Sequence, residues 1–272
     1  MKDGFTLVEV ALFLAVTSLL FVGIVAGTQN SIWQQRYNDS VQNFANFIRN
    51  VYSEVSNPQS IGNGRSDLAI YGRLITFGQE TNLDGTSIGT SGAEQKAFVY
   101  DVVGSAFNAA GTGDVTTMLK RLDANVVVTE TDEDGERQVV PVGIVDTYTP
   151  IWSATIESTE TKDGAAKLFE GSILIVRHPK SGTINTLYYD GVIDVNAIIA
   201  DANYREDYAS TKDLLVDYLD EFELRDVDFC VNPYGFGGTG ALIRDVRIIK
   251  NARNSSGVEL IDLDSGEDRC RK

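Results

Sequence analysis

Residues 4–27 read GFTLVEVALFLAVTSLLFVGIVAG, and Glu9 is the only formal charge between Phe5 and Gly27. At a rise of about 1.5 Å per residue, the run 5–27 makes a helix about 35 Å long, which is enough to cross a hydrocarbon core of about 30 Å. A carboxylate at membrane depth costs a few kcal/mol and is tolerated mainly where it acquires a partner. The sequence therefore predicts a membrane-spanning helix at 5–27, with Glu9 as a functional residue.

The helical pattern continues beyond Gly27 in a different form. Between residues 28 and 57, apolar residues recur at steps of four and three and make one stripe, while polar residues occupy the other faces. This pattern predicts the amphipathic half of the same helix, with its stripe packed on a globular domain, and Asn57-Pro58 is expected to end it. The stripe consists of Trp33, Tyr37, Val41, Phe44, Ile48, Val51 and Val55.

The remainder of the chain, 58–272, is predicted to be a β-rich head. Pro179-Lys180-Ser181-Gly182 is expected to form a hairpin turn and 78–95 an exposed loop. Two short helices are expected at 114–122, capped by Asp114, and at 210–222. A long N-terminal helix packed on an antiparallel sheet is an α+β fold. The expected strands are rich in β-branched and aromatic residues and lie at 67–77, 97–103, 125–129, 138–145, 171–177, 183–189, 227–231 and 241–249.

The N-terminal residues also resemble a known signal. Gly4-Phe5-Thr6-Leu7-Val8-Glu9, followed by the apolar run 10–16, is similar to the class III signal of type IV pilins and type II secretion pseudopilins. In that family a membrane-bound prepilin peptidase cuts after the glycine and N-methylates the new terminal residue. The resemblance, which covers roughly residues 1–55, implies a leader at 1–4, cleavage between Gly4 and Phe5, and a Glu9 that neutralises the terminal amine of a neighbouring subunit. A start upstream of Met1 stays open.

The resemblance implies a fold, a location and partners. It implies a pilin-like structural subunit, major or minor, of a type IV pilus that supports adhesion or motility. Its partners would be copies of itself or other pilins, prepilin peptidase, the inner-membrane assembly platform and the membrane. The chain would cross the inner membrane once before assembly and then enter an extracellular filament.

Other functions remain open at this point. Within the family, the alternative is a type II secretion pseudopilin, since the N-terminal signal is shared. Outside it, the chain could be a membrane-anchored surface-binding or DNA-uptake protein. An ordinary anchor helix or a secretory signal peptide is a further alternative, although Glu9 counts against a signal peptide, whose apolar core carries no charge.

The two cysteines, Cys230 and Cys270, are interpreted as a disulfide. In an exported chain an even pair favours a disulfide over two free thiols, which remain the alternative in a reducing compartment. The bond would hold the C-terminal segment on the sheet. Pilins resemble this arrangement in often carrying a C-terminal region bounded by a disulfide.

Motifs for catalysis are scarce, so we expect no enzyme and no cofactor. His178 is the only histidine, and its position before Pro179 at a predicted turn indicates a surface residue. The run 235–240, GFGGTG, has the spacing of a dinucleotide fingerprint, but a strand-like run follows where the phosphate-binding helix should begin. It is interpreted as a loop.

Two acidic clusters raise the question of calcium, which takes six to eight oxygen ligands. Acidic residues surround Gly135 in one cluster and Gly266 in the other. Neither cluster matches the full twelve-residue calcium loop, so a solvated acidic loop is the default interpretation. The weak candidates for a ligand set are Asp262, Asp264 and Asp268.

The net charge of −16 disfavours nucleic acid as a partner. Binding to phosphates depends on lysine and arginine, and the candidates for a basic patch are Arg244, Arg247, Lys250 and Arg253. In a strand, Arg244 and Lys250 would share one face while Arg247 took the other. These residues are therefore interpreted as solvated.

Overall fold

The computed structural model describes residues 7–57, 68–78, 80–81, 87–88, 95–105, 113–131, 137–141, 144–152, 154–159, 168–195, 214–233, 243–261 and 270. Several sequence predictions lie outside these residues. They are the cleavage site at Gly4 and Phe5, the glycine-rich loop at 235–240 and the calcium candidates Asp262, Asp264 and Asp268.

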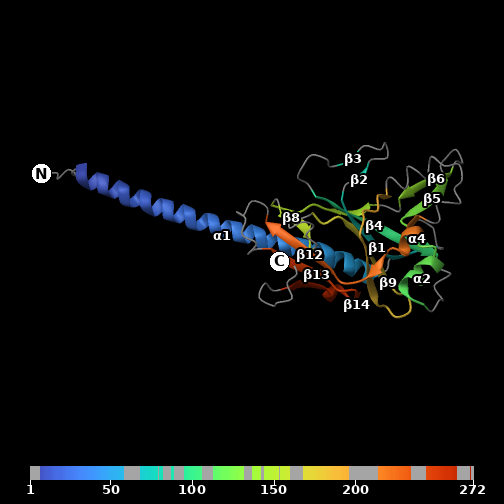
Figure 1. Ribbon diagram of the computed structural model, residues 1–272. Coiled ribbons are helices and arrows are strands. Elements are labelled where there is room, and N and C mark those ends of the chain that lie inside the picture. Colours follow the sequence, from blue (N-terminus) through green and yellow to red (C-terminus); the bar gives the residue numbers. More distant parts are fainter. Residues whose placement is uncertain are drawn as a thin grey trace.

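One unbroken helix, α1 (Leu7–Ser56), runs for 50 residues and confirms the predicted long N-terminal helix. Figure 1 shows its first part projecting clear of the head and its last part lying against the strands. The helix ends where Asn57 closes the last turn, with its backbone N–H donating to the Glu54 carbonyl and its side-chain amide donating to the Ser53 carbonyl.

The head contains a seven-stranded antiparallel sheet that mixes distant parts of the sequence. Its central strands, β9 and β1, lie side by side although about a hundred residues separate them along the chain. In spatial order the strands are β11 (Glu223–Leu224), β10 (Ile184–Tyr189), β9 (Gly171–Arg177), β1 (Leu68–Phe77), β4 (Ala97–Ser105) and β7 (Ile144–Tyr148), and β14 (Asn251–Ala252) also pairs with β10.

A second antiparallel sheet of four strands packs beside the first. Its order is β15 (Val258–Ile261), β13 (Arg244–Ile248), β12 (Val227–Pro233) and β8 (Ala154–Ser158). Two small hairpins, two short helices and a 3-10 turn complete the described part of the head. They are β2 (Glu80–Thr81) with β3 (Ser87–Ile88), β5 (Val127–Thr131) with β6 (Arg137–Pro141), α2 (Val115–Arg121), α4 (Leu214–Leu219) and η3 (Ser255–Gly257).

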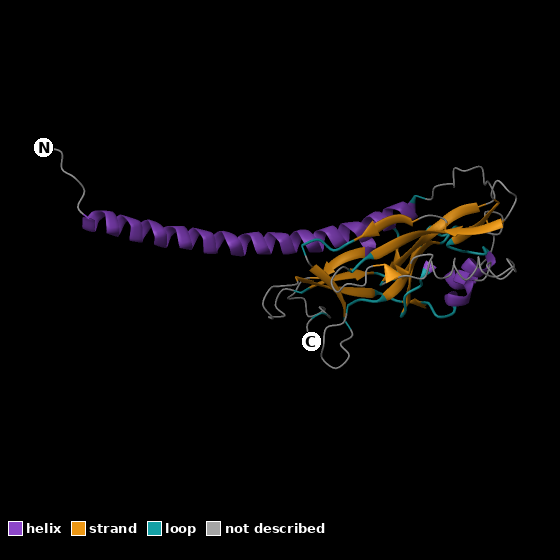
Figure 2. Ribbon diagram, turned by 90° about the horizontal axis from the view of Figure 1, so that it is seen from above, coloured by secondary structure: helices purple, strands orange, loops and turns teal. Residues whose placement is uncertain are grey.

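The large sheet has a hydrophobic cluster on each face. On one face, Ile173 and Ile175 of β9 pack with the second half of α1 and the inner face of the four-stranded sheet. On the other face, Leu174 and Val176 pack with α2 and α4. Figure 2 shows the long helix along one side of the strands and the short helices on the opposite side. Strand β9 is buried on both faces, which explains why its sequence is continuously apolar rather than alternating.

The structure confirms the coarse α+β prediction and corrects several details. The predicted strand 138–145 is wrong, because β6 ends at Pro141 and β7 begins at Ile144, each in a different sheet. The predicted loop 78–95 contains the β2–β3 hairpin, and Gln95 at its end is half-buried. Strands β8 and β15 were not predicted, since each is short and is defined by its pairing with a neighbouring strand, β12 or β13. Of the predicted helix 210–222, the part that the structure describes as helical is α4, which ends at Leu219.

The turn at Pro179-Lys180-Ser181-Gly182 is confirmed as the connection between β9 and β10. Gly182 has φ +69°, a left-handed conformation that favours glycine, and its N–H donates to the His178 carbonyl at 2.9 Å. The Nδ1 atom of His178 accepts from the backbone N–H groups of Lys180 and Ser181, each at 3.3 Å. The histidine therefore serves the geometry of the turn.

Candidate functional site

The first half of α1 is an exposed apolar surface. Phe21 is 68% exposed, and the same holds broadly for the large apolar side chains from Leu7 to Val25. Its most apolar 18-residue window has a mean hydropathy of 2.5, and none of it is buried by the head. An apolar surface of this extent is typical of a membrane or protein contact, and the segment is long enough to cross a membrane.

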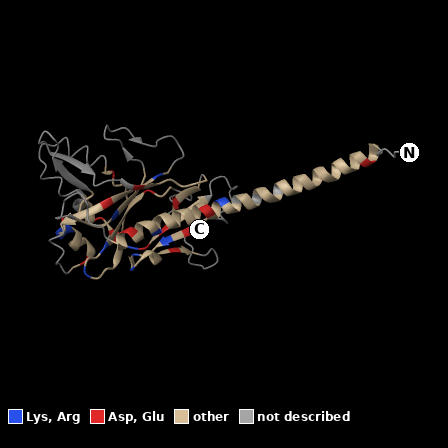
Figure 3. Cartoon of the chain, turned by 180° about the vertical axis from the view of Figure 1, so that it is seen from behind, with Lys and Arg blue, Asp and Glu red and all other residues tan. Residues whose placement is uncertain are grey.

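Glu9 lies in the first turn of the described helix and is exposed. Figure 3 shows the projecting part of the helix free of charged residues over most of its length, with the charges gathered near its two ends and on the head. A carboxylate near a helix N-terminus is favoured by the helix dipole. In an apolar surrounding, a carboxylate is tolerated mainly where it has a cationic partner.

Two threonine hydroxyls of this part of α1 bond to backbone carbonyls of the helix itself. The Thr17 hydroxyl donates to the Phe13 carbonyl at 2.8 Å, and the Thr28 hydroxyl donates to the Val25 carbonyl at 3.0 Å. Such bonds leave neither hydroxyl dependent on water. These two threonines are thus compatible with an apolar environment.

The second half of α1 is held by aromatic packing. Phe44 is fully buried, and its ring lies 5.1 Å from that of Phe229 and 5.4 Å from that of Tyr148, measured between centroids. Further rings, Phe47 and Phe77, complete the cluster. The stripe predicted from the sequence therefore faces the core from Tyr37 onward.

Hydrogen bonds from helix to head supplement this packing. The Ser40 hydroxyl donates to the Ile151 carbonyl at 2.7 Å, and the Tyr52 hydroxyl bonds the Thr186 hydroxyl. Burial raises the pKa of the Tyr52 hydroxyl above its ordinary value, because the ionised form is poorly solvated there. These contacts fix both the rotation of α1 and its position along its axis against the two sheets.

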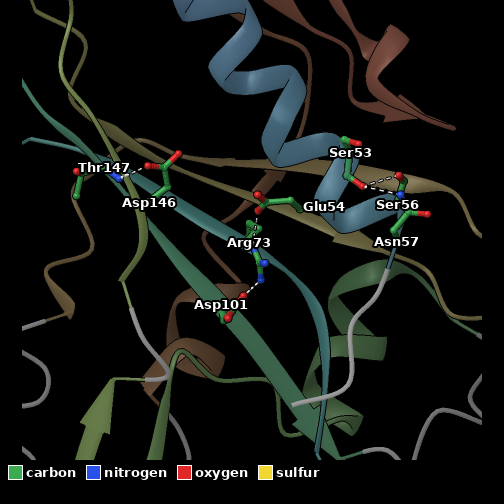
Figure 4. A network of polar contacts seen from close by, with 8 residues as sticks. All are labelled: Ser53, Glu54, Ser56, Asn57, Arg73, Asp101, Asp146 and Thr147. Carbon is green, nitrogen blue, oxygen red and sulfur yellow. Dashed lines mark hydrogen bonds and ion pairs between the residues drawn. The ribbon is translucent and has the colours of Figure 1, made fainter. Parts of the chain in front are cut away.

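A buried charge network joins the end of α1 to the large sheet, as Figure 4 shows. Arg73 of β1 forms an ion pair with Asp101, its cross-strand neighbour on β4, and its Nε lies 3.3 Å from Glu54 Oε2. The side chains of Arg73 and Asp101 are only 10% and 15% exposed, whereas that of Glu54 is 46% exposed. This network was not predicted from the sequence, although the arginine inside the apolar run LAIYGRLITF of β1 was a usable signal.

The outer face of the four-stranded sheet carries the disulfide. Cys230 of β12 is bonded to Cys270, which attaches the chain end to the sheet. Arg247, on the neighbouring strand β13, has its Nε 2.5 Å from Asp228 and its terminal nitrogen 3.6 Å from Asp245. The interpretation of Arg247 as solvated is therefore wrong, because two buried carboxylates bind it.

The described residues give no support for a metal centre. Among them, no group of three or more histidine, cysteine, aspartate or glutamate side chains is arranged to hold a metal ion. Around the first acidic cluster, the structure describes only the two paired strands β5 and β6 that flank it. The calcium candidates of the second cluster lie outside the described residues.

An open groove of about 480 Å³ lies on the head beside α2. Its lining includes the apolar residues Val115, Leu187 and Phe222 and the polar residues His178 and Thr183. Figure 1 places α2 at the end of the head remote from the projecting part of α1. No protein-family model, curated protein or solved structure matches the chain.

Proposed function

We propose that this protein is a structural subunit of a type IV pilus, assembled through its N-terminal helix. The observation that carries the proposal is one unbroken helix with two unlike halves, the first exposed and apolar and the second buried under two sheets. Before assembly the first half lies in the inner membrane. In the filament the same surface packs against other subunits, and the head faces outward.

Glu9 directs the assembly step in this proposal. After cleavage between Gly4 and Phe5, the new amine of one subunit meets the Glu9 carboxylate of a neighbour inside an apolar core. An ion pair in such a medium is strong, and a displaced subunit leaves a carboxylate without compensation. Glu9 therefore selects one axial register among several that the apolar surface alone would allow.

The test is the intact mass and the N-terminal residue of the protein recovered from sheared surface filaments. We expect a chain that begins at N-methylated Phe5. Replacement of Gly4 by leucine should block processing, and the protein should retain residues 1–4. A full-length chain confined to the membrane fraction, or an unchanged mature mass in the Gly4→Leu variant, contradicts the proposal.

A second candidate is a membrane-anchored protein that binds a surface through its head. The groove beside α2 favours it, since this groove lies at the end of the head farthest from the membrane helix. Such a protein needs no filament. Recovery from sheared filaments therefore separates the two candidates, and an image of the filament separates a pilus from a type II secretion pseudopilus.

A further inference from the structure

Trp152 adopts an unusual backbone conformation in an exposed position. Its φ is +59°, in the left-handed region, where a residue other than glycine is strained by about 1–2 kcal/mol. Asp123 shares this feature with φ +48°, but it follows the C-cap of α2, where a left-handed residue commonly ends a helix. Trp152 instead lies in the loop before β8 and presents a large side chain that is 52% exposed.

The contacts of this loop hold the indole against α1. The Arg36 guanidinium lies 4.7 Å from the centroid of the Trp152 ring. Next to it, the Ser40 hydroxyl binds the Ile151 carbonyl at 2.7 Å, and this carbonyl also accepts from the Ala154 N–H at 3.2 Å. The strained loop is thus attached to the helix at the point where α1 enters the head, since the neighbouring Tyr37 is buried in the core.

The position of Arg36 and Trp152, called here the Trp152 corner, can be estimated along the axis of α1 relative to the apolar run 5–27. Side chains on a helix point toward its N-terminus, so the Arg36 guanidinium and the ring below it lie about one turn back, at the level of Ile32. Ile32 is itself 48% exposed. Five residues separate Ile32 from Gly27, which corresponds to about 8 Å, and the headgroup layer on each side of a bilayer is about 5–8 Å thick.

We propose that Trp152 and Arg36 form a contact site for phospholipid headgroups, which seats the head on the outer surface of the membrane before assembly. Tryptophan favours the membrane–water interface, because its ring is apolar and its N–H can remain hydrated. The guanidinium binds headgroup phosphates in bidentate fashion. The inference rests on the proposed function only in requiring that the first half of α1 is inserted in the bilayer.

The charge of the protein makes this corner selective. The whole chain has a net charge of −16, most of it on the head, so the head as a whole is repelled by an anionic membrane surface. A cationic side chain stacked on an exposed indole offers a local attraction at the edge of the head that faces the membrane. The contact therefore fixes which side of the head approaches the headgroups.

The experiment uses the full chain in vesicles of phosphatidylethanolamine and phosphatidylglycerol. The protein has two tryptophans, so Trp33→Phe leaves Trp152 as the only indole, and Trp152→Phe leaves Trp33 as the matched control. Nitroxide labels are placed either on the headgroup or at carbon 12 of the acyl chain. We expect the headgroup label to quench Trp152 at least about twice as strongly as the deep label. Addition of Arg36→Gln to the Trp33→Phe protein should reduce this quenching.

Each outcome decides the proposal. Flotation with the vesicles that withstands carbonate extraction shows that α1 is inserted, and an absence of Trp152 quenching in that state overturns the headgroup site alone. Failure to float overturns it together with the membrane step of the proposed function. Shielding of Trp152 from both lipid labels and acrylamide, increasing with the protein-to-lipid ratio, assigns the corner to a second copy of the chain and also overturns the lipid site.

Discussion

The two halves of α1 have the same backbone conformation and opposite surroundings. Phe21 in the first half is 68% exposed, whereas Phe44 in the second half is fully buried among the rings of the head. The first half is apolar around its circumference, while the second is apolar along one stripe only. A helix that is apolar all round requires an apolar medium or several packing partners. A helix with a single apolar stripe requires only one packing partner. One half therefore completes a fold, while the other leaves an apolar surface free for contact with a membrane or, as proposed, with other subunits.

The largest expected effect comes from Glu9, the charge of the first half. We expect Glu9→Ala to be processed and inserted in the membrane normally but to lower the yield of filaments about tenfold or more, because the register-selecting ion pair is lost. The yield is measured by shearing and quantifying surface filaments. Val8→Ala is the control at the neighbouring position. Normal filaments from Glu9→Ala would refute the role assigned to this carboxylate.

The second effect compares Phe44 with Phe21. Phe44→Ala should lower the free energy of unfolding of the head by about 3–5 kcal/mol, since it removes a ring from a filled core. Phe21→Ala should change it by less than about 0.5 kcal/mol, because that ring touches nothing in the head. Guanidinium unfolding of the full chain in mild detergent, followed by near-ultraviolet circular dichroism, measures both. Equal effects of the two variants would contradict the division of α1 into halves.

The third effect concerns the disulfide, which acts on the head alone. Cys230→Ser combined with Cys270→Ser should lower the free energy of unfolding by about 4 kcal/mol, the chain-entropy value for a loop of this size. The bond closes a separation of 40 residues. The same unfolding experiment measures it, and insertion of α1 in vesicles should be unchanged. Loss of insertion in this variant would show that the two halves are coupled.

The fourth effect concerns the ion pairs of Arg73, which join the end of α1 to the large sheet. Asp101→Asn should cost about 3 kcal/mol, because Arg73 then keeps only the half-exposed Glu54 as a charged neighbour in the network. Glu54→Gln is the matched control and should cost less than about 1 kcal/mol, since its side chain is 46% exposed. Both are read from urea unfolding. A larger cost for Glu54→Gln than for Asp101→Asn would show that the principal partner of Arg73 is Glu54 of α1 and not Asp101 of the sheet.

The smallest effect lies on the face of the sheet that α1 does not touch. Asp114 caps α2 by accepting from the Thr117 N–H at 2.8 Å, and the hydrogen bonds from Thr117 hold its pKa below the usual value. Asp114→Ala should cost about 1 kcal/mol at neutral pH. Because the folded pKa is lowered, the charged cap stabilises the head above about pH 4 and loses this contribution as the pH falls through the folded pKa.

Asp114→Asn separates the charge of this cap from its geometry. Asparagine caps helices as well as aspartate does, so this variant should match the wild type at pH 7 and lack its pH dependence below about pH 4. Thermal unfolding at a series of pH values measures the difference. Parallel curves for the two proteins down to pH 2 would show that the carboxylate charge contributes nothing.

Prediction from sequence succeeded where the signal was local. The length of α1, its change from all-round to striped apolarity, the hairpin turn with Gly182 and the Asp114 cap all follow from residues within a few positions of one another. The pairing of Arg73 with Asp101 did not follow, because two strands far apart in the sequence must first adopt their register. Strands β8 and β15 were missed for the same reason.

The sequence by itself determined that this protein has a long helix of two unlike halves, a β-rich head and one acidic residue within the apolar run. Periodicity and composition are properties of a few neighbouring residues, so these features can be predicted from short stretches of the sequence. Only the tertiary structure decided that β9 lies between β1 and β10, that Arg247 lies between two buried carboxylates, and that Trp152 lies against Arg36. These arrangements depend on contacts between distant segments, which form only when both sheets close around the second half of α1.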